Sequence, residues 1–287
     1  MAERTIAHIL PGEPMTMGNL PLVQPLPTVR VEQISPFLLL HHFGPVQAAP
    51  GEDPMDLGPH PHRGFEPVTL LYAGGIRHKD SRGNEGFLRG GDVQWMTAGR
   101  GIIHSERASR EFLEEGGTLE GIQLWVNLPR DRKWIQPDYQ DIKEDDQPLL
   151  EFAGGKVRMR LVAGRYGEAS GPVRTQTPML VAKVFMARGS DHTFPLPSTY
   201  NVGCYLLDGG LRSAAGFSYP GQHLLHYRND GEVISLQAEA DTRLLLLAGA
   251  PIDEPVAQYG PFVMNTQTEV MEAMRDYRQG KMGFYID

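Results

Sequence analysis

Short runs that read as strands, separated by glycine-rich turns, extend along most of the chain. Examples lie at residues 68–72, 121–126, 157–162, 180–185 and 242–247. Several of these runs alternate apolar with polar residues, as strands with one buried face do. Short strands with frequent turns favour an antiparallel sandwich or barrel. The pattern therefore predicts an all-β fold.

One segment near the end has a helical pattern instead. Thr266 and Glu269 have the spacing of a capping box, in which each side chain bonds the other residue's backbone N–H. Four apolar residues then fall on one helical stripe: Val270, Met271, Met274 and Tyr277. We expect an amphipathic helix at 266–279 that packs on the β-structure. The alternative is a helix that binds a partner.

The length of 287 residues suggests two domains. Residues 129–148 are rich in charge and bounded by prolines, as domain linkers often are. The strand-and-turn pattern is similar on both sides of this stretch. We therefore predict two β-domains, at 1–140 and 141–287, with the helix in the second. The alternative is one domain with a long surface loop.

Composition excludes several functional classes. The 27 Lys and Arg against 35 Asp and Glu give a net charge of −8, which disfavours direct binding to nucleic acid or anionic lipid. No apolar run approaches the length of a membrane-spanning helix, and the first residues lack the pattern of a secretion signal. The lone cysteine, Cys204, allows no internal disulfide. We expect a cytoplasmic protein, or a nuclear one if the source is eukaryotic.

Two short motifs carry the candidate chemistry. His60 and His62 flank a proline, and His104 and Glu106 flank a serine. Side chains two apart in a strand share a face, so each pair points one way. Two such pairs on facing strands would surround one point with three imidazoles and a carboxylate. His78 also lies in this stretch, so that four of the ten histidines fall between residues 60 and 104.

This donor set suits one divalent metal ion, with Fe(II), Mn, Ni, Cu and Zn all compatible. Four protein ligands leave two positions open in a six-coordinate site. Open positions distinguish a catalytic metal from a structural one. A redox metal there could bind a chelating substrate, O₂ or both.

The segments around these motifs resemble the signature sequences of pirins, which are members of the cupin superfamily. The resemblance is carried by residues 58–66 and 90–106, and it extends to 35–44, 78–84 and 260–265. It implies a bicupin, with two jelly-roll-like β-barrels in tandem and the metal in the N-terminal one. It also implies His60, His62, His104 and Glu106 as the ligands, and iron as the usual metal.

The resemblance implies two different activities. Some bacterial members of the family open the flavonol quercetin with O₂, whereas eukaryotic members act as nuclear transcriptional coregulators that respond to the oxidation state of iron. The first hypothesis is a quercetin 2,3-dioxygenase-like enzyme with a small aromatic chelating substrate. In this hypothesis, Glu106 acts as a catalytic base or is a ligand that leaves the metal. The alternative is a redox-sensing binding module with a protein partner and no turnover.

Four more residues are candidates for the surroundings of the metal. Strand parity from His62 places Glu66 on the ligand face, provided that no irregularity intervenes. Phe65 and Trp125 are candidate pocket walls, with barrel core as the alternative, and Gln123 is a candidate hydrogen-bonding partner of a ligand. The second half of the chain has no His-x-His motif, and we expect it to be metal-free. A third reading is a metal-dependent isomerase or hydrolase.

Overall fold

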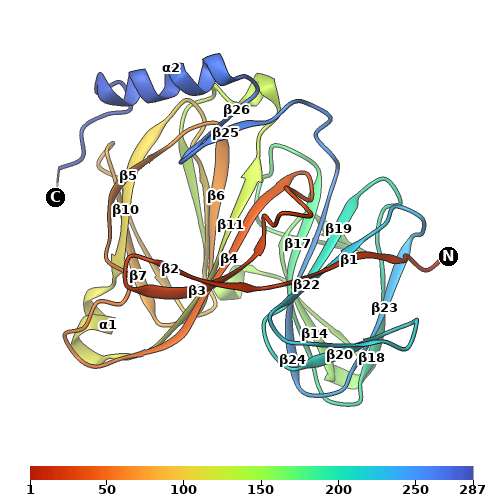
Figure 1. The fold of residues 1–287 in the computed structure, drawn as a ribbon. Helices are drawn as coiled ribbons and strands as arrows, with labels where there is room; N and C mark the ends of the chain where they lie inside the picture. Colours follow the sequence, from red (N-terminus) through yellow and green to blue (C-terminus); the bar gives the residue numbers. More distant parts are fainter. Residues whose placement is uncertain (287) are drawn as a thin grey trace. The chain divides into compact units, whose positions relative to one another are not determined.

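The computed structural model describes residues 1–286, and antiparallel strands predominate in this part of the chain (Figure 1). The chain divides into two compact units. The histidine unit comprises Pro14–Leu22, Leu39–Glu144 and the C-terminal segment from Ile252. The second unit comprises Met1–Glu13, Val23–Leu38 and Asp145–Pro251. Each unit is described by itself.

Two antiparallel sheets account for most of the histidine unit. The larger sheet has the order β12 (Asp138–Ile142), β9 (Val93–Thr97), β6 (Phe65–Ala73), β11 (Gly117–Asn127), β4 (Phe37–Ala48), β3 (Leu20–Leu26) and β2 (Glu13–Met17). The smaller has the order β5 (Leu57–His62), β10 (Ile102–Ala108), β7 (Gly75–Asp80) and β8 (Glu85–Arg89). Buried side chains from both sheets, including Phe43, Leu71, Ile76 and Leu88, form one core.

Shorter elements complete this unit. They are α1 (Arg110–Glu115), two 3₁₀ turns (Arg130–Arg132 and Glu144–Asp146), the β25–β26 hairpin (Ala257–Tyr259 and Phe262–Met264) and α2 (Gln267–Arg278).

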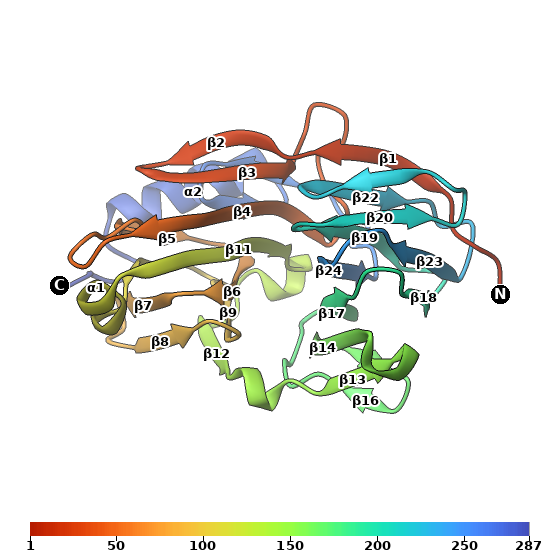
Figure 2. The same cartoon turned by 90° about the horizontal axis from the view of Figure 1, so that it is seen from below.

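The second unit has the same plan of a seven-stranded and a four-stranded sheet (Figure 2). The larger has the order β1 (Ile6–Pro11), β22 (His223–Tyr227), β19 (Asn201–Leu206), β24 (Thr242–Gly249), β17 (Met179–Met186), β14 (Val157–Ala163) and β13 (Leu149–Phe152). The smaller has the order β18 (Asp191–Pro195), β23 (Val233–Ala238), β20 (Gly210–Ser213) and β21 (Ser218–Pro220). A 3₁₀ turn (Ala153–Gly155) and the β15–β16 pair (Arg165–Tyr166 and Ala169–Ser170) are peripheral.

The five sequence segments predicted as strands all lie in strands of the structure. They fall within β6, β11, β14, β17 and β24. Most residues of these strands are buried, in β6 and β24 on both faces. Cys204 and Phe194 are examples of core residues from the two sheets of the second unit. The all-β prediction is confirmed.

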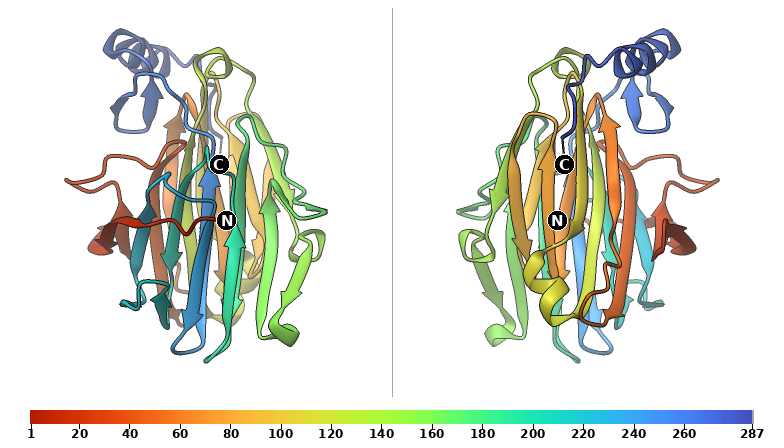
Figure 3. Two further views of the ribbon diagram at one scale, coloured as in Figure 1. Left: turned by 90° about the vertical axis from the view of Figure 1, so that its right-hand side faces the viewer. Right: turned by 90° about the vertical axis from the view of Figure 1, so that its left-hand side faces the viewer.

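The C-terminal helix forms with its predicted capping box. The Thr266 hydroxyl accepts from the Glu269 backbone N–H at 3.2 Å, and the Glu269 carboxylate accepts from the Thr266 N–H at 2.9 Å. Val270 and Ala273 of α2 pack with Ile103 and Phe262, and the helix lies at one end of the strands of its unit (Figure 3). Met271 is 68% exposed, so its expected place on the buried stripe is wrong.

The division into units differs from the predicted boundary between residues 140 and 141. Strand β1 pairs with β22, which places the N-terminal residues in the second unit. Helix α2 packs on residues of the histidine unit, not on the second unit as predicted. The sequence could not show this exchange, because tertiary pairing brings these distant segments together.

Within residues 1–286, no helix has the length and apolar character needed to cross a membrane.

Candidate metal centre

Two neighbouring strands of the smaller sheet in the histidine unit, β5 and β10, carry the four candidate ligands, and β7 lies next to β10. In the β5–β10 ladder, His104 lies directly opposite His60. In the β10–β7 ladder, His104 lies opposite Asp80 and Glu106 lies opposite His78. This second ladder is regular, so His104 and Glu106 share a face of β10. The two motifs therefore lie on neighbouring strands of one sheet, whereas the sequence analysis placed them on facing strands.

The imidazoles of His60, His62 and His104 form one cluster. One nitrogen atom from each lies within 4.8 Å of the others. The ring centroids are 4.3 Å apart for His60 and His104, and 4.8 Å apart for each of the other two pairs. This convergence gives three nitrogen donors around one point.

A sharp turn at Gly64 separates β5 from β6 and sets the position of His62. Gly64 has a φ of +88°, and a Cβ there would lie 1.9 Å from the carbonyl oxygen of Val263. Only glycine fits such a close approach. The next residue, Phe65, then packs edge-on against the His62 ring, with centroids 5.1 Å apart.

Burial keeps the imidazoles of His62 and His104 neutral. Burial lowers the pKa of His62 and His104 well below the usual value, and the neighbouring His60 lowers both further. The Nδ1 of His62 and the Nε2 of His104 are buried and have no hydrogen-bond partner among the described residues. An unpartnered buried polar atom is costly, and a neutral imidazole nitrogen is a metal donor.

Glu106 is not among the residues whose ligand atoms converge, but it is buried and within electrostatic reach of His60. The Thr69 hydroxyl of β6 lies 3.0 Å from Glu106 Oε1 and 2.8 Å from Gln123 Oε1 of β11, so it can donate to either oxygen. Burial raises the pKa of Glu106, while His60 and the Thr69 hydroxyl oppose that rise. Glu106 is therefore a buried carboxyl group with a high affinity for protons as long as no cation lies beside it.

Two aromatic rings form a wall next to His62. The Trp125 ring is 5.5 Å from that of His62 and 4.3 Å from that of Phe65, between centroids. Phe65 is fully buried, whereas Trp125 and Gln123 are half-buried. The structure thus places Phe65 and Trp125 against His62, and Gln123 beside the threonine that can bond Glu106. Their role in holding a ligand stays a prediction.

His78 is a further residue of the site, although it belongs to neither of the two sequence motifs. Its Nε2 lies 2.8 Å from Nδ1 of His104, and it is buried. Burial lowers the pKa of His78 to about 4. A histidine that binds a metal through one nitrogen commonly bonds a neighbour through the other, which fixes the ring. The grouping of His78 with His60, His62 and His104 in the sequence was the available signal.

The arrangement fits a divalent metal ion. Three imidazoles converge, two of them with unpartnered buried nitrogens, and a carboxyl group lies on the same strand face as His104. Nitrogen donors with one carboxylate suit Fe, Mn, Ni, Cu or Zn.

Comparisons with known proteins show the family to which the chain belongs. The family model for pirin matches residues 20–126, and the model for the pirin C-terminal cupin domain matches residues 181–283. The chain belongs to the pirin family. Its fold is accordingly that of a bicupin, with one cupin domain in each half of the sequence.

Two bacterial proteins are close relatives of this pirin family chain. A putative quercetin 2,3-dioxygenase of Pseudomonas aeruginosa is 41% identical over 250 residues, covering 87% of each protein. The crystal structure of quercetin 2,3-dioxygenase from Acinetobacter baumannii is 37% identical, with a TM-score of 0.95 over 99% of this chain and 100% of that one.

A more distant neighbour is a bacterial pirin from Escherichia coli in complex with nickel(II). It is 18% identical, with a TM-score of 0.68 over 85% of this chain and 99% of that one. This likeness supports the shared fold.

Glu66 does not lie where strand parity placed it. Phe65 contacts His62 and Thr69 contacts Glu106, so these odd-numbered residues of β6 face the cluster. Glu66 is on the opposite face of β6, where its Oε1 accepts from the Thr97 hydroxyl at 2.7 Å. The turn at Gly64 starts a new strand, so parity counted from His62 does not carry across it. The expectation that Glu66 flanks the ligands is wrong.

Proposed function

We propose that this pirin family member binds one divalent metal ion through His60, His62, His104 and Glu106, and that it is a dioxygenase acting on flavonols such as quercetin. The observation that carries the proposal is the cluster of three imidazoles whose ligand atoms lie within 4.8 Å of one another. The similarity to two proteins named quercetin 2,3-dioxygenase supports the choice of substrate class.

Fe(II) is the metal we propose, with Mn, Ni, Cu and Zn as alternatives. When bound, it would supply a Lewis acid and a redox centre for the reaction of a chelated substrate with O₂. We propose that the second unit holds no metal, since His223 and His226 lie on opposite faces of β22. Metal analysis of the reconstituted protein should therefore give one ion per chain.

In this mechanism, the protein residues bind the substrate and move its proton. The rings of Phe65 and Trp125 would pack against a flat aromatic substrate beside the histidines. Glu106 would take the proton from the chelating hydroxyl, or would leave the metal. The Thr69 hydroxyl holds one oxygen of Glu106, which leaves the other available.

The first test is O₂ uptake. The protein is reconstituted with Fe(II) without air, mixed with quercetin, and compared with His104→Ala. Uptake that is abolished in the variant supports the dioxygenase. Glu106→Gln tests the base: a variant that binds iron and turns over normally would show that Glu106 is not the base.

The alternative is a redox-sensing regulatory module with a protein partner. Absence of uptake with iron confirmed in the protein would contradict the dioxygenase and favour this alternative. The corresponding measurement is partner capture with Fe(II)-loaded and Fe(III)-loaded protein side by side. Full activity on a small metabolite with zinc, which is redox-inert, would instead favour an isomerase or hydrolase.

A further inference from the structure

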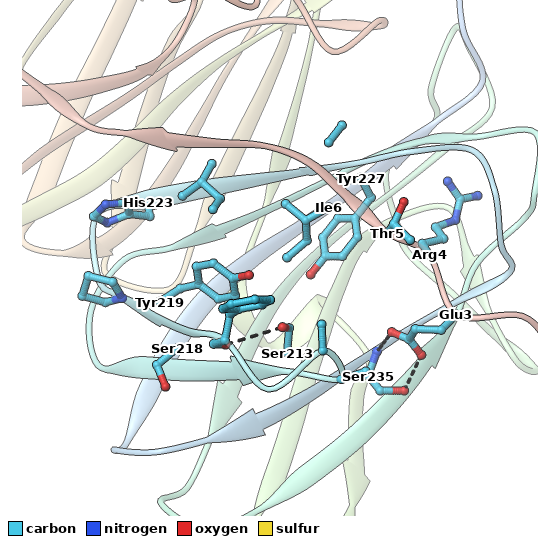
Figure 4. Close-up of a pocket in the computed structure, with 16 residues that line it drawn as sticks. Glu3, Arg4, Thr5, Ile6, Ser213, Ser218, Tyr219, His223, Tyr227 and Ser235 are labelled. Atoms are coloured by element: carbon cyan, nitrogen blue, oxygen red, sulfur yellow. Dashed lines mark hydrogen bonds between the residues drawn. The ribbon is translucent and has the colours of Figure 1, made fainter.

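A cavity lies in the second unit, which does not contain the histidine cluster. It has a volume of about 720 Å³ and is lined by β1, by β22 and by the β20–β21 hairpin (Figure 4). Pockets of roughly 300–1,000 Å³ hold small organic molecules. The proposed dioxygenase function makes no use of this cavity.

Apolar and aromatic side chains dominate its lining. Ile6 and Ile9 come from β1, Phe217 from the β20–β21 turn and Tyr219 from β21. Phe217 is 66% exposed and Ile9 is 48% exposed. Large apolar side chains exposed together around a hollow are typical of a binding site.

The charged residues of the lining are already paired. Both oxygens of Glu3 accept from Ser235, one from its N–H at 2.7 Å and one from its hydroxyl at 2.8 Å. The guanidinium of Arg4 donates to the carbonyls of Pro197 and Tyr200 and to the Asn229 side chain, and it points away from the cavity centre (Figure 4). The cavity therefore favours a ligand without net charge.

Two polar atoms of the lining residues have no hydrogen-bond partner among the described residues: the Nε of Arg4 and the hydroxyl of Tyr227. The hydroxyl of Tyr227 is buried and has no hydrogen-bond partner among residues 1–286, and Tyr227 is only 3% exposed. Its hydroxyl and that of Tyr219 point toward the centre of the pocket in Figure 4. Tyr219 also contributes to raising the pKa of Tyr227, after burial, Cys204 and Glu3, so the two phenols are within electrostatic reach.

A buried hydroxyl without a partner is rare in native proteins, because it loses its bonds to water on folding. The Tyr227 hydroxyl can donate to an acceptor atom placed in the cavity. Since its raised pKa keeps it protonated at neutral pH, it acts there as a donor.

We propose that this cavity of the second unit binds a neutral aromatic molecule of about two fused rings, whose carbonyl oxygen accepts a hydrogen bond from Tyr227. The rings lie between Ile6 and the aromatic side chains of Phe217 and Tyr219. This places a second small-molecule site on the chain, in the unit for which we propose no metal.

The test uses the fluorophore Prodan, a neutral naphthalene with one ketone, and the full-length protein. We expect saturable binding of one molecule per chain, with emission shifted to the blue. Tyr227→Phe removes only the hydroxyl and should weaken binding about 3- to 10-fold, as the loss of one neutral hydrogen bond does. Phe217→Ala removes a ring from the rim and should weaken binding by a similar factor.

Matched controls are available in the histidine unit. Tyr259→Phe and Phe87→Ala change residues that are 63% and 53% exposed and do not line this cavity, so both should bind Prodan as the wild type does. Because Phe217 is exposed, its variant remains informative even if Tyr227→Phe does not fold. Equal affinity of the two cavity variants and the wild type would overturn the proposal, as would binding that fails to saturate or disappears when the metal is added.

Discussion

The Nε2 of His78 lies 2.8 Å from the Nδ1 of His104, so one buried histidine bonds another that is a proposed ligand. A neutral His104 that binds a metal through Nε2 must carry its proton on Nδ1. This N–H then donates a hydrogen bond to His78. His78 therefore acts as an acceptor that fixes both the orientation and the tautomer of His104. The geometry of this ligand thus depends on a residue from a neighbouring strand.

Replacing His78 with Phe should lower metal affinity by about 10- to 100-fold, the usual effect of losing a partner of a ligand. His78→Gln keeps a carbonyl acceptor and should recover part of the affinity. Competition against a chelating dye measures the metal affinity of both variants. The control is His226→Phe in the second unit, which should bind metal normally. Equal affinity of the Phe and Gln variants would refute the acceptor role.

Thr69 and Thr97 offer a matched pair of substitutions. Each hydroxyl bonds a buried glutamate, Glu106 in the first case and Glu66 in the second. Replacing either threonine with Val should lower the free energy of unfolding by about 1–3 kcal/mol. Only Thr69→Val should also reduce O₂ uptake, by roughly 10-fold, because only Glu106 faces the histidines. Equal uptake by the two variants would argue against a positioning role for Thr69.

Glu66 should make stability depend on pH. Burial raises its pKa from 4.5 to about 7. Between these values the unfolded chain loses the proton and the folded chain keeps it, so the free energy of unfolding falls as pH rises. The stability of Glu66→Gln relative to wild type should therefore increase by roughly 3 kcal/mol from pH 4.5 to pH 7 and then level off.

Urea unfolding of both metal-free proteins across this range measures the effect. Metal-free protein is needed because metal binding to the histidines would add its own pH dependence. Parallel pH curves for the two proteins would be inconsistent with the raised pKa of Glu66.

Lys133 joins the turn at Gly64, which follows β5, to the C-terminal β25–β26 hairpin. Its buried ammonium group donates to the Gly64 carbonyl and the Asn127 side chain at 2.7 Å, and to the Val263 carbonyl at 3.1 Å. Lys133→Met removes the donor to the Gly64 and Val263 carbonyls, while Asn127 Oδ1 keeps the Leu128 N–H, and should lower the free energy of unfolding by about 2–4 kcal/mol. The exposed Lys156→Met is the control and should unfold like wild type. Chemical unfolding distinguishes the two, and identical midpoints would contradict this role.

The sequence by itself determined the strand-rich fold, the capped C-terminal helix and the pairing of donors within each motif. These features are local: alternation fixes which residues share a strand face, and the Thr266–Glu269 spacing fixes a cap. The spacing of residues along one strand was therefore enough to group His60 with His62, and His104 with Glu106.

Only the tertiary structure decided which strands are neighbours. It placed His60 opposite His104, and it brought His78 against His104 from a third strand. It also turned Glu66 away, because the Gly64 turn ends one strand and the next sets its own alternation. Pairing between strands depends on contacts between residues distant in the chain, and alternation within one strand carries no information about them.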